Sequence, residues 1–144
     1  MAYNASRGFV EVYNQNTSAY VPLPLKHISY ENYKVTPAQR IDLDSYTAET
    51  GELVRHVLSH TRSKIEFETP YINSTQWATV LTIIKNGYIS TKERKVKLRY
   101  YSPEVDDYRE GYFYRPDIEF TVRNVDNNTG VINYDSIRVA FIEY

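Results

Sequence analysis

The 144-residue sequence contains no cysteine and few glycines, and these shortages exclude several kinds of chemistry. Without cysteine the chain can form no disulfide, thiolate nucleophile or cysteine-based zinc site. Its five glycines are scattered, so it has no glycine-rich loop for phosphates or dinucleotides. No serine stands in the G-x-S-x-G pattern of hydrolases. We therefore expect a protein that is not an enzyme, with no catalytic residues, no bound metal and no cofactor.

The sequence also lacks an excess of one charge and long hydrophobic runs. The formal net charge is −1 and the isoelectric point is about 6.3, so the chain as a whole offers no basic surface to nucleic acid. Its start, MAYNASRGFVEVYNQ, lacks the charged and apolar regions of a signal peptide. No apolar run is long enough to cross a bilayer. We expect neither a membrane partner nor a sequence-specific nucleic-acid partner.

Tyrosine is abundant instead, with 15 residues in a chain that is 42% hydrophobic. A chain of this length predicts a single compact domain with a modest core. Tyrosine buries a ring while its hydroxyl stays at a wet edge, so an excess of tyrosine suits sheet surfaces and protein interfaces. The composition therefore favours a tyrosine-rich sheet protein.

Alternating apolar and polar residues predict strands along most of the chain. The segments that carry this signal are 9–13, 39–44, 63–69, 95–101, 118–123 and 136–144. In the fifth of these, we expect Ile118, Phe120 and Val122 to face the core. The last segment is apolar on both faces, so it is either central in a sheet or covered by a second chain. Pro22 and Pro24 cannot donate ladder hydrogen bonds and predict a sheet edge.

One helix is predicted at about residues 73–86. Asn73 or Ser74 can cap its first turn, and Asn86 with Gly87 is typical of a helix end. Its apolar stripe is formed by Trp77, Val80, Leu81 and Ile84. The predicted fold is mainly β: an antiparallel β-sandwich or barrel with this single flanking helix.

The segment YTAETGELVRHVLSHTRSK, residues 46–64, allows two interpretations. Glu52, His56 and His60 are spaced four apart and could hold a metal if the segment were a helix. On a strand, however, residues four apart lie about 13 Å from one another, too far to share one ion. The valines and the uninterrupted continuation into an alternating strand favour the strand. We therefore predict a long hairpin arm at about residues 45–63, turning near Thr50 and Gly51.

From residue 44 to residue 144, the order of these segments resembles small tail-module proteins of long-tailed bacteriophages. The matching parts are DSYTAETGELVRHVL, SKIEFETPYI, STQWATVLTIIKNG, KVKLRYYSPEVDDY with GYFYRPD, and the closing IRVAFIEY. The resemblance covers about two-thirds of the chain and implies a tail-tube-like β-sandwich at residues 39–144. Residues 1–38 depart from the pattern and are interpreted as an N-terminal arm or extra strands.

The resemblance implies a structural subunit of a bacteriophage tail, in the tail tube, the distal tail and baseplate, or a tail-completion ring. Such a protein forms rings, most often of six copies, contacts neighbouring tail proteins, resides in the virion tail and is assembled in the host cytoplasm. We expect its subunit contacts at Tyr46, Leu53, Val54, Arg55, His56, Val57, Leu58, His60, Ile142 and Tyr144. Two alternatives stay open. One is a receptor- or carbohydrate-binding β module of a phage particle, with Tyr112, Phe113 and Tyr114 stacking on sugars. The other is a metal enzyme using His56 and His60.

Overall fold

A computed structural model describes residues 3–144 of the chain; the first two residues of the N-terminal region lie outside them. The largest sheet has seven strands, and every neighbouring pair is antiparallel. Across this sheet the strands are β2 (Ala19–Pro22), β1 (Val10–Asn14), β8 (Lys95–Ser102), β9 (Asp107–Tyr114), β12 (Arg138–Glu143), β6 (Val57–Glu68) and β3 (Lys34–Asp42).

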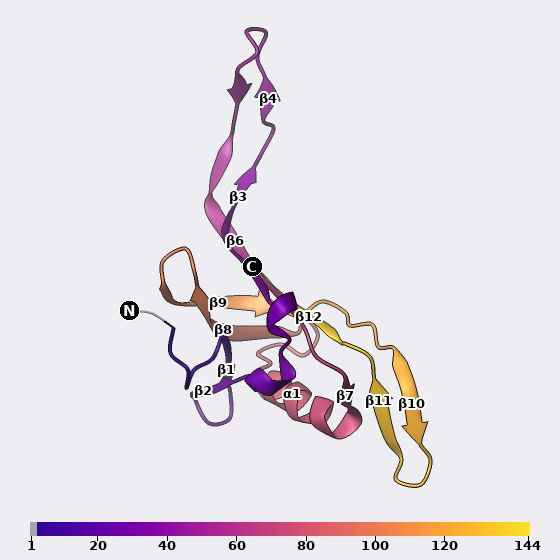
Figure 1. Cartoon of the computed structure of the whole chain (residues 1–144). Helices are drawn as coiled ribbons and strands as arrows, with labels where there is room; N and C mark the ends of the chain where they lie inside the picture. The colour runs from indigo at the N-terminus through magenta and orange to yellow at the C-terminus, as the bar shows by residue number, and fades with distance from the viewer. Residues whose placement is uncertain (1–2) are drawn as a thin grey trace.

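Two smaller sheets extend from this body (Figure 1). A three-stranded sheet contains β10 (Val122–Asp126), β11 (Val131–Tyr134) and β7 (Ile72–Asn73), and β4 (Tyr46–Thr47) pairs with β5 (Leu53–Val54). Two short 3-10 helices, η1 (Leu25–His27) and η2 (Tyr30–Asn32), connect β2 to β3. The prediction of a mainly β, antiparallel, sandwich-like fold is confirmed. Within residues 3–144 the large sheet stays open and does not close into a barrel.

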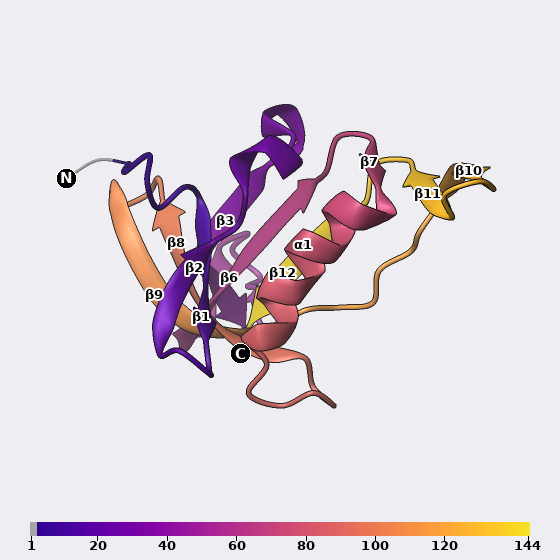
Figure 2. The same cartoon turned by 90° about the horizontal axis from the view of Figure 1, so that it is seen from below.

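The one α-helix among residues 3–144, α1 (Ser74–Asn86), forms where the sequence predicts it. Asn73 Oδ1 accepts a hydrogen bond from the Gln76 amide, and the Gln76 side chain accepts one from the Asn73 amide, which makes a capping box. Trp77, Val80 and Ile84 are buried. Figure 2 shows the helix lying across one face of the large sheet, so its apolar stripe closes one side of the core.

The core lies between this helix and the inner face of the sheet. Alternate residues of each central strand point inward, as Val96, Leu98 and Tyr100 do in β8. Valines and phenylalanines of β1, β9, β12 and the second half of β6 complete the cluster. Fully burying one such side chain stabilises the fold by about 1.5–3 kcal/mol. Period-two alternation therefore predicts the core-facing residues of these strands correctly.

The C-terminal strand β12 lies between β9 and β6, which explains why both of its faces are apolar. The central position predicted for it is confirmed. Because β12 pairs with β6 from Arg138 to Ile142 and with β9 at Ile142 and Glu143, the sheet itself accounts for its apolar faces without a second chain. The free edges of the large sheet are β2 and β3. Pro22 ends β2 and Pro24 follows it, so the edge predicted from the prolines is confirmed.

The strand expected at residues 118–123 begins later than predicted. Residues 118–121 are irregular, and β10 starts at Val122. Phe120 and Val122 are exposed, so the prediction that they face the core is wrong for both. Phe120 nonetheless lies edge-on to Trp77, with 5.6 Å between ring centroids. The segment does alternate, but its hairpin with β11 projects beyond the body (Figure 1), and β10 is exposed along its whole length.

Candidate subunit-contact surface

A long hairpin arm projects from the body (Figure 1). It consists of the outer parts of β3 and β6 and, at its tip, the β4–β5 pair. Strand β6 marks where it begins: residues 57–60 are exposed, whereas Ser63, Ile65 and Phe67 are buried. The arm therefore begins earlier in the chain than the predicted residue 45. Its first strand is the outer part of β3, so residues 39–44, which were expected in the body, belong to the arm.

Backbone pairing defines the arm as far as its tip. The Leu43 amide donates to the His56 carbonyl at 2.7 Å, and the Ala48 amide donates to the Glu52 carbonyl at 2.7 Å. Gly51 has a φ of +90°, which a residue without Cβ adopts at no steric cost. The turn predicted near Thr50 and Gly51 is confirmed.

The arm exposes large apolar side chains that the rest of residues 3–144 leaves largely uncovered. Leu53 is 64% exposed, and Leu43 and Tyr46 are each 56% exposed. Val57 and Leu58 are also exposed, whereas Val54 is half-buried. A two-stranded ribbon has no second layer, so these side chains stay in water unless another chain covers them. The predicted contact residues of the arm are therefore exposed apart from Val54, and Leu43, which was not predicted, is exposed beside them.

The polar residues of the arm are spread along it. Arg55 is paired with Asp42 at 2.8 Å, and the His56 ring lies 6.1 Å from the Tyr46 ring. His60 is near the root, with Nε2 2.7 Å from the Tyr144 carbonyl oxygen. Across residues 3–144, no three His, Asp or Glu side chains gather in a way that could hold a metal ion.

A buried polar network fixes the root of the arm to the body. Ser63 Oγ lies 2.7 Å from the Tyr100 hydroxyl and accepts a hydrogen bond from the Ala38 amide at 3.0 Å. The Ser63 amide in turn donates to Glu143 Oε1 at 2.8 Å. Gly111 makes room for that carboxylate, because a Cβ there would lie 2.4 Å from Glu143 Oε2.

The network coincides with a bend in the edge strand. The register of β3 against β6 shifts between Thr36 and Gln39, and Ala38 has a φ of 48°. A bulge of this kind bends a strand and increases its twist. Burial raises the pKa of Tyr100 above its ordinary value, so its hydroxyl keeps its proton and stays in the network across neutral pH. The root therefore sets the direction in which the arm leaves the body.

The outer face of the large sheet is rich in tyrosine and lysine. Lys95 Nζ lies 4.7 Å from the Tyr144 ring centroid and 5.3 Å from that of Tyr112, and Lys97 Nζ lies 5.2 Å from that of Tyr13. With Gln15 and Ile89, most of these residues line a hollow of about 440 Å³. The predicted contact residues Ile142 and Tyr144 lie at this face rather than on the arm.

The aromatic group considered for sugar stacking divides between two faces of β9. Phe113 is fully buried in the core, whereas Tyr112 is 48% exposed at the hollow. Tyr114 lies beside Tyr144, with 5.6 Å between ring centroids. These residues are therefore strand residues of the sheet, and only the tyrosines reach its outer surface.

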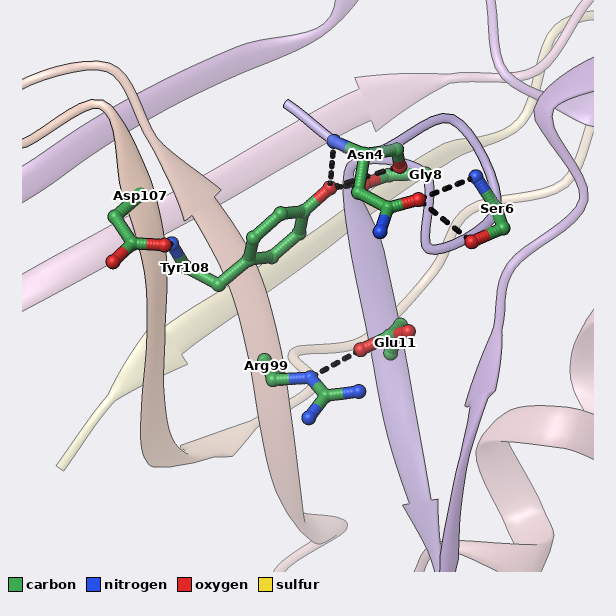
Figure 3. Close-up of polar contacts among 7 residues, drawn as sticks. All are labelled: Asn4, Ser6, Gly8, Glu11, Arg99, Asp107 and Tyr108. Carbon is green, nitrogen blue, oxygen red and sulfur yellow. Dashed lines mark hydrogen bonds and ion pairs between the residues drawn. The ribbon is translucent and has the colours of Figure 1, made fainter. Parts of the chain in front are cut away.

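The N-terminal segment is held against the body (Figure 3). The Tyr108 hydroxyl accepts a hydrogen bond from the Asn4 amide at 3.1 Å and donates one to the Gly8 carbonyl at 2.7 Å. In β1, the buried carboxylate of Glu11 pairs with Arg99 of β8. Strand β1 is thus part of the large sheet, and the segment before it is held against β9 through Tyr108.

Two features of this surface escaped the sequence-based prediction. The root network joins residues that are distant in the chain, and nothing local marks Ser63 as buried. The hollow is the second feature: Lys95 and Lys97 lie over tyrosine rings in it, which their alternation along β8 did not predict. The available signal for the hollow was that these lysines alternate with core residues in a chain unusually rich in tyrosine.

Comparisons with known proteins place the chain among proteins of similar fold. A model of a family of unknown function, DUF6711, matches residues 5–144. A solved structure with a similar fold is the tail of an empty GTA particle with C6 symmetry, at 12% identity and a TM-score of 0.52. That likeness covers 99% of this chain and 95% of the neighbour. No curated protein sequence matches. The helices among residues 3–144 are too short and too polar to span a bilayer.

Proposed function

This chain belongs to the DUF6711 family of unknown function, and we propose that it is a structural subunit of a bacteriophage or phage-like tail. The observation that carries the proposal is its likeness in fold to a chain from the tail of a GTA particle, over nearly the whole length of both. A likeness over nearly the full length of both chains supports a shared role more strongly than a likeness confined to a common core would. It also includes the N-terminal region, which the sequence pattern left aside.

The exposed arm supports the same proposal. An isolated two-stranded ribbon is marginally stable, and this one carries several uncovered apolar side chains at its tip. Covering one of these side chains contributes about 1.5–3 kcal/mol at most. A neighbouring subunit that covers Leu43, Tyr46 and Leu53 would therefore stabilise both the contact and the arm.

In its finer form the proposal is a ring of six copies in the virion tail, joined by the arm and touching other tail proteins. The C6 symmetry of the GTA tail suits this number. A head-to-tail contact, with the arm of one copy on the body of the next, closes into a ring when its rotation fits. The protein then acts by assembly, without catalysis or cofactor.

The test compares the full chain with an arm-shortened variant. Because Leu43 and His56 are paired across the arm, residues 44–55 can be replaced by Asn-Gly, which favours a tight hairpin turn. We expect the full chain to form six-fold rings by negative-stain imaging and native mass spectrometry. The variant should keep its far-ultraviolet circular dichroism and thermal transition but remain monomeric. A full chain that stays monomeric at high concentration, or a variant that still forms rings, would contradict the proposal.

A further inference from the structure

The hollow on the outer face of the sheet holds two cations that form no ion pair with the acidic groups among residues 3–144. The ion pairs found among residues 3–144 include neither Lys95 nor Lys97. Both ammonium groups lie over tyrosine rings, which hold their positions without removing their charge. The hollow also has an apolar side, with Ile89 47% exposed. It therefore suits a ligand that is both anionic and apolar.

The tip of the arm has the complementary character. Glu49 and Glu52 are exposed, and neither takes part in an ion pair among the described residues. The neighbouring Arg55 is already paired with Asp42. Beside these carboxylates stands Leu53, the most exposed leucine of the arm. Two carboxylates and one leucine thus match two lysines and an apolar wall in the hollow.

The arm cannot reach the hollow of its own chain. The ten residues from Gly51 to His60 carry the tip about 33 Å from the root, at about 3.3 Å per residue. Figure 1 shows the arm pointing away from the body, where β1, β8 and β9 bear the hollow. The matching tip must therefore come from a second copy, in a head-to-tail contact.

We propose that the acidic tip of the arm, Glu49, Glu52 and Leu53, docks into the Lys95–Lys97 hollow of a neighbouring copy. This inference rests on the proposed function, since it assumes that the protein self-assembles, and it names the surface that receives the arm. Leu53 covers Ile89 and Tyr112, while the two carboxylates face the two ammonium groups. Charge complementarity of this kind sets register and excludes wrong partners.

Two charge-reversed variants test the contact. The first carries Lys95→Glu and Lys97→Glu, so that its hollow becomes acidic like its own tip. The second carries Glu49→Lys and Glu52→Lys, so that its tip becomes basic like its own hollow. Each variant alone should need at least about a hundredfold higher concentration to assemble, because like charges then meet at every contact. Wild-type assembly should also weaken as sodium chloride rises from 50 to 500 mM.

The two variants mixed in equal amounts should assemble again. The acidic tip of the first then meets the basic hollow of the second, and the basic tip of the second meets the acidic hollow of the first. Because the two variants must alternate around the ring, only a ring with an even number of copies can close. Native mass spectrometry should find equal amounts of both chains in each ring, and the chain that carries all four substitutions should assemble alone.

The controls separate this inference from the proposed function. A variant with Lys26→Glu and Lys85→Glu changes the net charge equally at exposed lysines outside the hollow, and it should assemble as the wild type does. If the wild type forms no rings, the proposed function fails. If the wild type forms rings but the variants assemble normally, or their mixture does not recover, only the docking contact is wrong.

Two more measurements complete the test. Circular dichroism must show each variant folded; if the glutamates unfold the chain, Lys95→Gln with Lys97→Gln replaces them and should still weaken assembly about tenfold. Retention of duplex DNA by a filter is measured in parallel. Normal assembly together with lost DNA retention would mean that the hollow binds phosphates, and would overturn the proposal.

Discussion

Replacing Ser63 with alanine should loosen the arm at its root without removing any apolar contact. The hydroxyl of Ser63 is the partner of two groups, the Tyr100 hydroxyl and the Ala38 amide. The side chains of Ser63 and Tyr100 are almost completely buried, so water cannot replace the lost partner. The Ser63 amide still donates to Glu143 in the variant, because that bond uses the backbone.

The expected loss follows from counting the groups left without partners. A buried hydroxyl or amide that loses its partner costs about 1–3 kcal/mol. Ala38 is only half-buried, so its amide can find water and contributes the lower end of that range. The free energy of unfolding of Ser63→Ala should therefore fall by about 2–4 kcal/mol. Urea unfolding measures this as a lower midpoint at an unchanged slope.

A double-mutant cycle with Tyr100→Phe checks the cause. In the Ser63→Ala background the Tyr100 hydroxyl is already without a partner, so removing it should cost less than in the wild type. We expect a coupling of about 1 kcal/mol or more between the two changes. Ser59→Ala, on the exposed half of the same strand, is the matched control and should be neutral. Additive effects of Ser63→Ala and Tyr100→Phe, or a cost at Ser59 as large as at Ser63, would refute the reasoning.

Two further predictions concern the body. Gly87→Ala should lower the free energy of unfolding by about 1–3 kcal/mol, because its Cβ would lie 2.3 Å from Val12 Cγ1 and 3.1 Å from the Tyr13 carbonyl; an unchanged melting temperature would contradict this. Arg138 holds the pKa of Glu66 below its ordinary value, so the pair stabilises the folded state at neutral pH, and this contribution disappears as pH falls from about 4.5 through the folded pKa. Arg138→Ala should lower the urea midpoint at pH 7 by more than at pH 3; equal losses at both pH values would exclude this pair as the source.

Local sequence patterns predict the helix and the core strands correctly because the interactions that form these elements are local. The capping box of α1 involves residues three apart, and the inward positions of β8 follow from the alternation of a strand. Edge position was also predictable for β2, because proline cannot donate to a ladder. In these elements the sequence pattern and the final packing depend on the same few residues.

The bounds of the arm could not be predicted in the same way. Ile41 and Leu43 alternate with charged residues, as in any half-buried strand, and only the position of β6 decides whether a body lies beneath them. The same reason applies to Phe120, which lies in an alternating segment but has an exposed side chain. Whether a strand is covered depends on partners far away in the chain, which local periodicity does not encode.

The network at the arm root is likewise non-local, since Ser63 and Tyr100 lie on strands that are not neighbours in the sheet. Serine is a common surface residue, and its burial here depends on the bend in β3 at Ala38. A pattern of residue types therefore predicts that an arm exists but not what holds it in place.

The near-zero net charge of the chain bears on how such arms find their partners. With a net charge of −1, copies of this protein neither repel nor attract one another strongly at long range. In the contact proposed above, specificity comes from short-range complementarity between small groups of opposite charge, the glutamates of the arm tip and the lysines of the outer face. A fixed root makes such recognition effective, because a tip held in one direction loses less conformational freedom on docking than a mobile one. In the proposed contact, the bend at Ala38 and the charges at the tip would act on the same step, the docking of one copy onto the next.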